Sequence, residues 1–188
     1  MEHTAKNINN TQIRKLTCAA VCLALCLILP FLTGHIPQIG QALSPMHIPV
    51  FLCGFLCGWP YALLTGFIAP LLRNLLFQMP PMPGAIAMAF ELAAYGCLTG
   101  VLYPIFPKKT RYIYITLVIS MIGGRLIWGA ARFILAGLSG STFPFEAFLA
   151  GAVTNAIPGI ILHIALIPPL VAALDRAGLI FHENSDNK

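Results

Sequence analysis

The chain has 188 residues, of which 58% are hydrophobic and only 9% are charged, and its formal net charge is +5. Soluble domains carry about 25% charged residues, so this sequence has too few polar side chains to cover a surface that faces water. We therefore predict an all-α integral membrane protein. The positive charge does not indicate nucleic-acid binding, because the Lys and Arg residues gather mainly at the flanks of apolar segments.

The first 15 residues, MEHTAKNINNTQIRK, form a polar and weakly basic segment that we interpret as a cytoplasmic N-terminal segment. No small-residue cleavage site follows the first apolar segment, so we expect that segment to be retained as a helix. The six cysteines have no His or acidic residue near them in the sequence. We interpret them as small packing residues, not as a disulfide framework or a metal site.

Six apolar segments are long enough, or nearly so, to cross a hydrocarbon core about 30 Å thick. They cover residues 16–33, 44–58, 60–78, 84–104, 112–137 and 147–174. The second segment is the weakest, because Pro45 and Pro49 interrupt it, and it is expected to be kinked or short. The segments predict one six-helix transmembrane domain over residues 16–174, followed by a C-terminal tail at 175–188.

Positive charge in the connections predicts the orientation. The connection PKKTR at residues 107–111 is the only internal one that contains Lys or Arg, and such charges favour the cytoplasmic side. Six crossings then place both termini in the cytoplasm. The outward connections are expected at about 34–46, 79–83 and 138–146.

Four charged residues lie inside the apolar segments: Arg73, Glu91, Arg125 and Arg132. Each costs roughly 2.5–3.5 kcal/mol at a helix centre, so each is expected to face a partner or a cavity. Arg73 and Glu91 are equally far from the predicted turn near residue 82, which places them at nearly the same depth in antiparallel helices. We therefore predict an Arg73–Glu91 pair.

Around these charges we expect a polar cavity in the outer half of the bilayer. Three arginines against one glutamate leave it positive, which suits a small anion because guanidinium binds carboxylate or phosphate in bidentate fashion. The connections at 34–49 and 138–146 are suited to close over a ligand, although ordinary surface connections fit them equally well. The candidate substrate-binding residues are Arg73, Asn74, Glu91, Arg125, Arg132, Asn155, His47 and Gln38.

Structural roles remain open for several of these residues. Arg73 and Glu91 can form a purely structural ion pair, and Arg132 can extend its side chain to the membrane boundary. Asn155 can bond a neighbouring helix instead of a ligand. We expect His163 in the inner half of the last segment, far from the cluster, as a packing residue.

The motifs of the common catalytic sites are absent from the sequence. It contains no P-loop, no H-E-x-x-H and no G-x-S-x-G. Glu91 is the single acid within the apolar segments, so a pair of catalytic carboxylates is not available there. We predict that the chain is not an enzyme and that it uses no cofactor or metal.

Several of these features together resemble a known family, the substrate-binding S components of energy-coupling factor (ECF) vitamin transporters. The likeness rests on the length, six predicted helices with both termini inside, the short basic N-terminal segment and an A-x-x-x-A motif at Ala20 and Ala24. The run HIPVFLCGFLCGWPYALLTGFIAPLLRNLLFQMPPMPGAIAMAFELAAYG (47–96) is most similar to the pantothenate-type group.

The resemblance implies a high-affinity vitamin site on the outer side of a bacterial cell membrane. It also implies assembly with a membrane coupling protein and two cytoplasmic ATPases, with Ala20 and Ala24 docking on the coupling protein. It favours a small carboxylate-bearing vitamin such as pantothenate. An aromatic-rich site that would stack a thiamine-like ring is not expected, because Trp59 is predicted at the inner boundary and Trp128 is the only other tryptophan.

Other functions remain open at this level. The substrate of an S component could be folate, pyridoxine, hydroxymethylpyrimidine or cobalamin. A membrane enzyme acting on a phosphorylated lipid is a less favoured alternative, because it would need an acidic cluster for a metal. A stand-alone channel or carrier without ATPase partners is another.

Overall fold

The computed structural model describes residues 2–33, 43–107, 109–141, 143–152 and 156–181, and the regular elements in these ranges are all helices. They are α1 (Glu2–Ile28), the 3-10 helix η1 (Leu29–Thr33), α3 (His47–Cys57), α4 (Trp59–Phe77), α5 (Gly84–Ile105), α6 (Thr110–Leu138), α7 (Phe145–Ala152) and α8 (Ile157–Arg176). The fold class is thus all-α, as predicted.

Five helical spans are long and apolar enough to cross a membrane: Asn10–Leu32, Trp59–Phe77, Gly84–Ile105, Thr110–Leu138 and Ile157–Arg176. Large apolar side chains such as Leu75 and Phe133 lie exposed on the outer faces of these helices. Exposed apolar surface of this extent is stable next to lipid tails and not next to water. The chain is therefore a multi-pass membrane protein.

The sequence located most of these helices well. The segments predicted at 60–78, 84–104 and 112–137 agree with α4, α5 and α6 to within two residues at each end. The helix predicted to be weak is the short α3, which has 11 residues and rises only about 16 Å. Whether α3 completes a sixth crossing remains a prediction, as does the division of the chain at residues 15 and 174.

Two predictions need correction. The single segment expected at 147–174 is divided, because α7 ends at Ala152 and α8 begins at Ile157. The first helix is longer than expected, since α1 starts at Glu2 and includes most of the predicted N-terminal segment.

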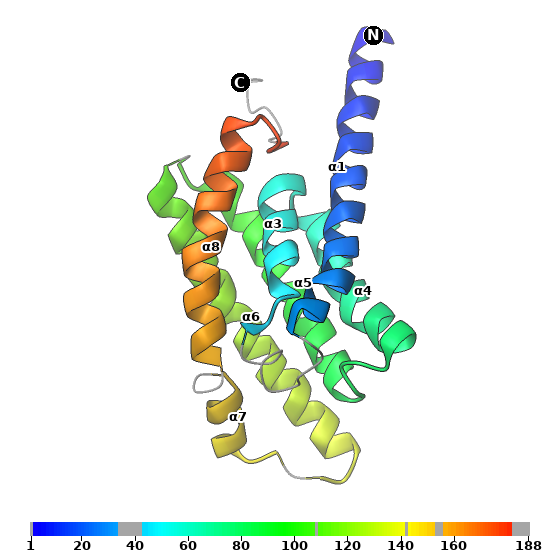
Figure 1. Cartoon of the computed structure of the whole chain (residues 1–188), viewed down its shortest axis with the longest axis vertical. Helices are drawn as coiled ribbons and strands as arrows, with labels where there is room; N and C mark the ends of the chain where they lie inside the picture. Colours follow the sequence, from blue (N-terminus) through cyan, green and yellow to red (C-terminus); the bar gives the residue numbers. More distant parts are fainter. Residues whose placement is uncertain (1, 34–42, 108, 142, 153–155, 182–188) are drawn as a thin grey trace.

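Helix α5 occupies the centre of the bundle and packs against α3, α4 and α6 (Figure 1). Helix α1 packs on α3 and α4, α8 packs on α6 and α3, and α7 contacts α6. The start of α1, the end of α8 and the α5–α6 connection lie at one end of the molecule, and α7 lies at the other (Figure 1). This agrees with termini on the same side; that this side is the cytoplasm remains a prediction.

Glycines hold α4 and α5 in close contact. A Cβ on Gly96 would lie 2.5 Å from the carbonyl oxygen of Ala62, and one on Gly100 even nearer to the backbone nitrogen of Trp59. Gly66 on α4 meets the backbone of Leu92 in the same way. The G-x-x-x-G spacing at 96 and 100 therefore allows close backbone approach. Because this contact sets the rotation of α5, it also determines which face of α5 points away from α4.

Candidate functional site

A buried carboxylate lies at the centre of the candidate site. Glu91 is 1% exposed, and its Oε1 lies 2.9 Å from a guanidinium nitrogen of Arg125. The Tyr95 hydroxyl donates a hydrogen bond of 2.8 Å to the same oxygen, and His47 Nε2 lies 3.6 Å from it. Three helices contribute these groups: α5 supplies Glu91 and Tyr95 one turn apart, α6 supplies Arg125, and α3 supplies His47 as its first residue.

A fourth helix adds an imidazole to this group. His163 of α8 stacks on His47 with ring centroids 5.7 Å apart, and its Nε2 lies 3.3 Å from the carbonyl oxygen of Ser44. Phe51 packs against both His163 and Tyr95. The expectation that His163 lies far from the cluster was therefore wrong. Since α8 begins at Ile157, His163 is only about 9 Å from the start of its helix.

The predicted Arg73–Glu91 pair is also wrong. Arg73 donates a hydrogen bond of 2.5 Å to the carbonyl oxygen of Leu27, and its guanidinium lies over the rings of Phe31 and Phe77, 5.0 and 5.4 Å from their centroids. It thus faces α1 and η1, whereas Glu91 faces α3 and α6. Similar depth does not make two residues neighbours, because Glu91 is five positions from Gly96 and so points about 140° away from the face that contacts α4.

Small residues on α6 make room for the cluster. A Cβ on Gly124 would overlap the ring of Tyr95, so this glycine lets the tyrosine lie flat against α6. The ring position brings the Tyr95 hydroxyl to Glu91, next to Arg125. The sequence signal for this contact is the Gly123–Gly124 pair directly before Arg125.

An aromatic group surrounds Trp128 beyond Arg125. The Arg125 guanidinium lies 5.9 Å from the Trp128 ring centroid, Phe148 of α7 stacks on Trp128 at 6.3 Å, and Phe143 meets it edge-on at 6.1 Å. The sequence did not reveal this group, because Phe143 and Phe145 fall in the predicted connection at 138–146 and Phe148 in the apolar segment predicted at 147–174. The pattern F-P-F-E-A-F could have indicated it.

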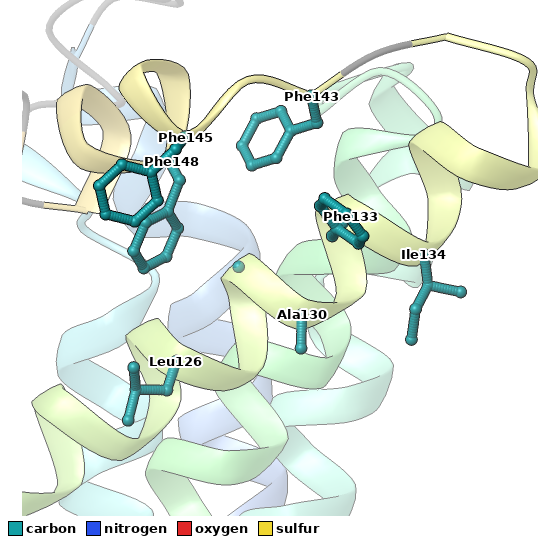
Figure 2. Close-up of a pocket in the computed structure, with 8 residues that line it drawn as sticks. Leu126, Ala130, Phe133, Ile134, Phe143, Phe145 and Phe148 are labelled. Atoms are coloured by element: carbon teal, nitrogen blue, oxygen red, sulfur yellow. The ribbon is translucent and has the colours of Figure 1, made fainter.

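A hollow lies beside this aromatic group, between α6 and α7. It has a volume of about 390 Å³ and is lined by Leu126, Gly129, Ala130, Phe133, Ile134, Phe143, Phe145 and Phe148. Figure 2 shows the phenylalanines of α7 and the preceding connection facing the α6 side chains across this space. The wall is apolar, so it can accept a hydrocarbon or ring surface but can fix no polar group by itself.

The remaining candidate residues have separate positions. Arg132 lies over the ring of Phe143 at 5.3 Å, and Asn74 donates a hydrogen bond of 2.7 Å to the carbonyl oxygen of Pro80, which fastens the connection after α4. Gln38 and Asn155 lie outside the described residues. Ala20 and Ala24 lie on the exposed face of α1. Ligand contact by any of these residues remains a prediction.

The cluster combines a neutralised charge pair with unused hydrogen-bonding capacity. His47 is 2% exposed, yet neither of its ring nitrogens has a hydrogen-bond partner within the part of the chain that the structure describes. Buried polar atoms are rarely left without partners, and an unpaired one requires an explanation such as a bound molecule. Groups of three or more His, Cys, Asp or Glu arranged for a metal ion do not occur among the described residues. The arrangement places unused hydrogen-bonding capacity of His47 beside the Glu91–Arg125 pair.

Comparison with known proteins gives one match. The family described as "ECF transporter, substrate-specific component" matches residues 14–171. No curated protein and no solved structure matches the chain.

Proposed function

Because the chain belongs to the family of substrate-specific components of ECF transporters, we propose that it binds a small, carboxylate-bearing vitamin such as pantothenate for import. The family consists of transport subunits that bind substrate and is not an enzyme family. Membership also implies association with the other components of such a transporter, a coupling protein and ATPases. The identity of the vitamin and the residues that contact it are our proposal.

One observation carries the proposal, namely the incomplete hydrogen bonding of His47 beside the Glu91–Arg125 pair. Glu91 is seven residues from the start of α5, so the cluster lies about 10 Å from the end of that helix. This is the end that carries the α4–α5 connection and faces away from the start of α1 (Figure 1). A ligand there would enter from the side opposite the termini, which is the outer side if the termini are cytoplasmic.

Binding can be tested with the full chain purified in detergent. We expect mass spectrometry of co-purified small molecules to find one vitamin, and titration calorimetry to give a submicromolar Kd for that compound. Pantothenate heads the panel, with folate, pyridoxine, hydroxymethylpyrimidine, cobalamin and thiamine as competitors. If the folded protein binds none of a broad vitamin panel, the proposal fails. If it binds another carboxylate-bearing vitamin, only the choice of vitamin fails; if it binds one without a carboxylate, the substrate class fails as well.

We further propose that the exposed face of α1 docks on the coupling protein. Ala20 and Ala24 lie on this face, whereas Ala19 and Cys22 lie on the opposite face against the bundle. Small residues on a lipid-exposed helix face allow another helix to approach closely. The face is therefore available to a partner without any rearrangement of the bundle.

Replacing Ala24 with Trp should block this contact. We expect at least a 10-fold loss of coupling protein and ATPases that co-purify with the chain, while the Kd of the vitamin changes less than twofold. Ile115→Trp, at an exposed position of α6, is the matched control and should keep the complex intact. Co-purification of Ala24→Trp at the control level would rule out this docking face.

A further inference from the structure

Two arginines share one face of α6 but differ in their electrostatic partners. Arg125 and Arg132 are seven residues apart, so they point in nearly the same direction and are separated by about 10 Å along the helix. Arg125 is paired with Glu91 at 2.9 Å. Arg132 forms none of the ion pairs in the described part of the chain, and its buried Nε has no hydrogen-bond partner there.

Aromatic rings join the two arginines into one continuous wall. Arg125 lies over Trp128, Trp128 meets Phe143 edge-on, and Phe143 lies under the guanidinium of Arg132. The wall thus begins at the buried cluster, continues over apolar ring surface and ends at a second cation. A molecule lying along it would meet a hydrogen-bonding region, an apolar region and a positive charge in that order.

The charges at the two ends of this wall are different. At the inner end, the carboxylate of Glu91 and the guanidinium of Arg125 offset each other. His47 Nδ1, which has no hydrogen-bond partner among the described residues, adds hydrogen-bonding capacity there. A second carboxylate there would be repelled by Glu91 and would compete with it for Arg125. At the outer end, Arg132 carries a charge that no described side chain offsets. A buried guanidinium nitrogen without a partner is costly unless an anion completes its bonding.

We infer that Arg132 binds the anionic end of the ligand, and that the Glu91–Arg125–His47 cluster holds its neutral, hydrogen-bonding end. This inference rests on the proposed function and names the substrate class more closely. The ligand is an elongated organic monoanion of about 10 Å, with its carboxylate at one end and hydroxyl or amide groups at the other. Arg132 discriminates the acid from neutral analogues, whereas Arg125 anchors either of them.

A matched pair of ligands tests the assignment. Pantothenate and panthenol differ only in that the alcohol carries CH₂OH where the acid carries the carboxylate, so the ratio of their Kd values measures recognition of the charge. For the full chain in detergent, we expect panthenol to bind roughly 10- to 100-fold more weakly than pantothenate, the usual effect of one hydrogen bond to a charged group. In Arg132→Gln this ratio should fall to about 1, because binding of the acid weakens and binding of the alcohol does not.

The control variants separate this role from a structural one. Arg125→Gln should weaken binding of both compounds and keep the ratio of their Kd values. Arg132→Lys should retain part of the ratio that Arg132→Gln abolishes. Arg111→Gln, at an exposed position at the start of α6, should change neither Kd. Thermal unfolding of each variant shows that it is folded.

The possible failures are distinct. An unchanged ratio in Arg132→Gln, or a ratio that collapses in Arg125→Gln instead, overturns the inference and leaves the proposed function standing. Tight binding of a vitamin that has no anionic group overturns the inference and the carboxylate-bearing substrate class, and leaves only the role as a vitamin-binding subunit standing. Absence of binding to any vitamin by the folded wild-type chain overturns both.

Discussion

Removing Arg125 is expected to destabilise the folded protein more than neutralising Glu91 does. In Arg125→Met the carboxylate of Glu91 stays buried, with a side chain 2% exposed, and loses its cation. An uncompensated buried charge of this kind costs about 3–5 kcal/mol. In Glu91→Gln the amide still accepts from Tyr95, and Arg125, whose side chain is 19% exposed, can recover some hydration. The free energy of unfolding should then fall by roughly 1–3 kcal/mol.

The double variant Glu91→Gln with Arg125→Met should recover most of the loss, because no buried charge remains unpaired. Reversible unfolding in mixed micelles measures all three free energies. Glu146→Gln, at an exposed position of α7, is the matched control and should change the stability by less than about 0.5 kcal/mol. If the two single effects add in the double variant, Glu91 and Arg125 are not coupled, and the description of the site would have to change.

A methyl group at Gly96 or Gly100 is expected to separate α4 from α5. The added Cβ would meet backbone atoms of Ala62 or Trp59, and backbone cannot rotate away as a flexible side chain can. Overpacking of this kind costs about 1–3 kcal/mol or more. Because α5 carries Glu91 and Tyr95, a shift of this helix should also lower ligand affinity. This loss is expected although the mutated residue lies on a different face of α5, the one turned toward α4.

Gly137→Ala provides the comparison. No atom lies within 4 Å of the position of its Cβ, so the only effect is the better helix propensity of alanine, about 0.5–1 kcal/mol in favour of the variant. Thermal unfolding of the three alanine variants should therefore give opposite signs at residue 137 and at residues 96 and 100. Equal stability of all three would mean that α4 and α5 are not held in backbone contact.

Position along α4 and α5 could be derived from this sequence, whereas direction around each helix could not. Counting residues from Pro80–Gly84 located the ends of α4 and α5 to within about one residue, because Pro and Gly give clear signals there. The same count correctly marked Glu91 as a buried charge needing a cation. It selected the wrong arginine, since the rotation of α5 is set by the fit of Gly96 and Gly100 against α4, which emerges only when the helices pack.

The break between α7 and α8 could not be predicted for a different reason. Residues 147–174 are apolar with little interruption, and hydropathy alone cannot tell one long helix from a short helix followed by a longer one. Moving the start of the last span to Ile157 brings His163 beside His47. It also makes α7 a separate helix, whose Phe148 packs on Trp128. Neither the position of His163 beside His47 nor that of Phe148 on Trp128 could be predicted without this boundary between α7 and α8.

The way in which α7 is attached has a mechanical consequence. Among the described residues, Phe143–Ala152 contact the rest of the bundle through aromatic rings and small residues, and no side-chain hydrogen bond or ion pair fastens them to another helix. Dispersion contacts weaken gradually as surfaces slide, whereas a hydrogen bond is lost within a fraction of an ångström. Helix α7 is thus held against α6 by apolar contacts and not by polar ones. The strength of the contact between Phe148 and Trp128 should therefore depend on temperature and on the lipids around it, and hardly at all on salt.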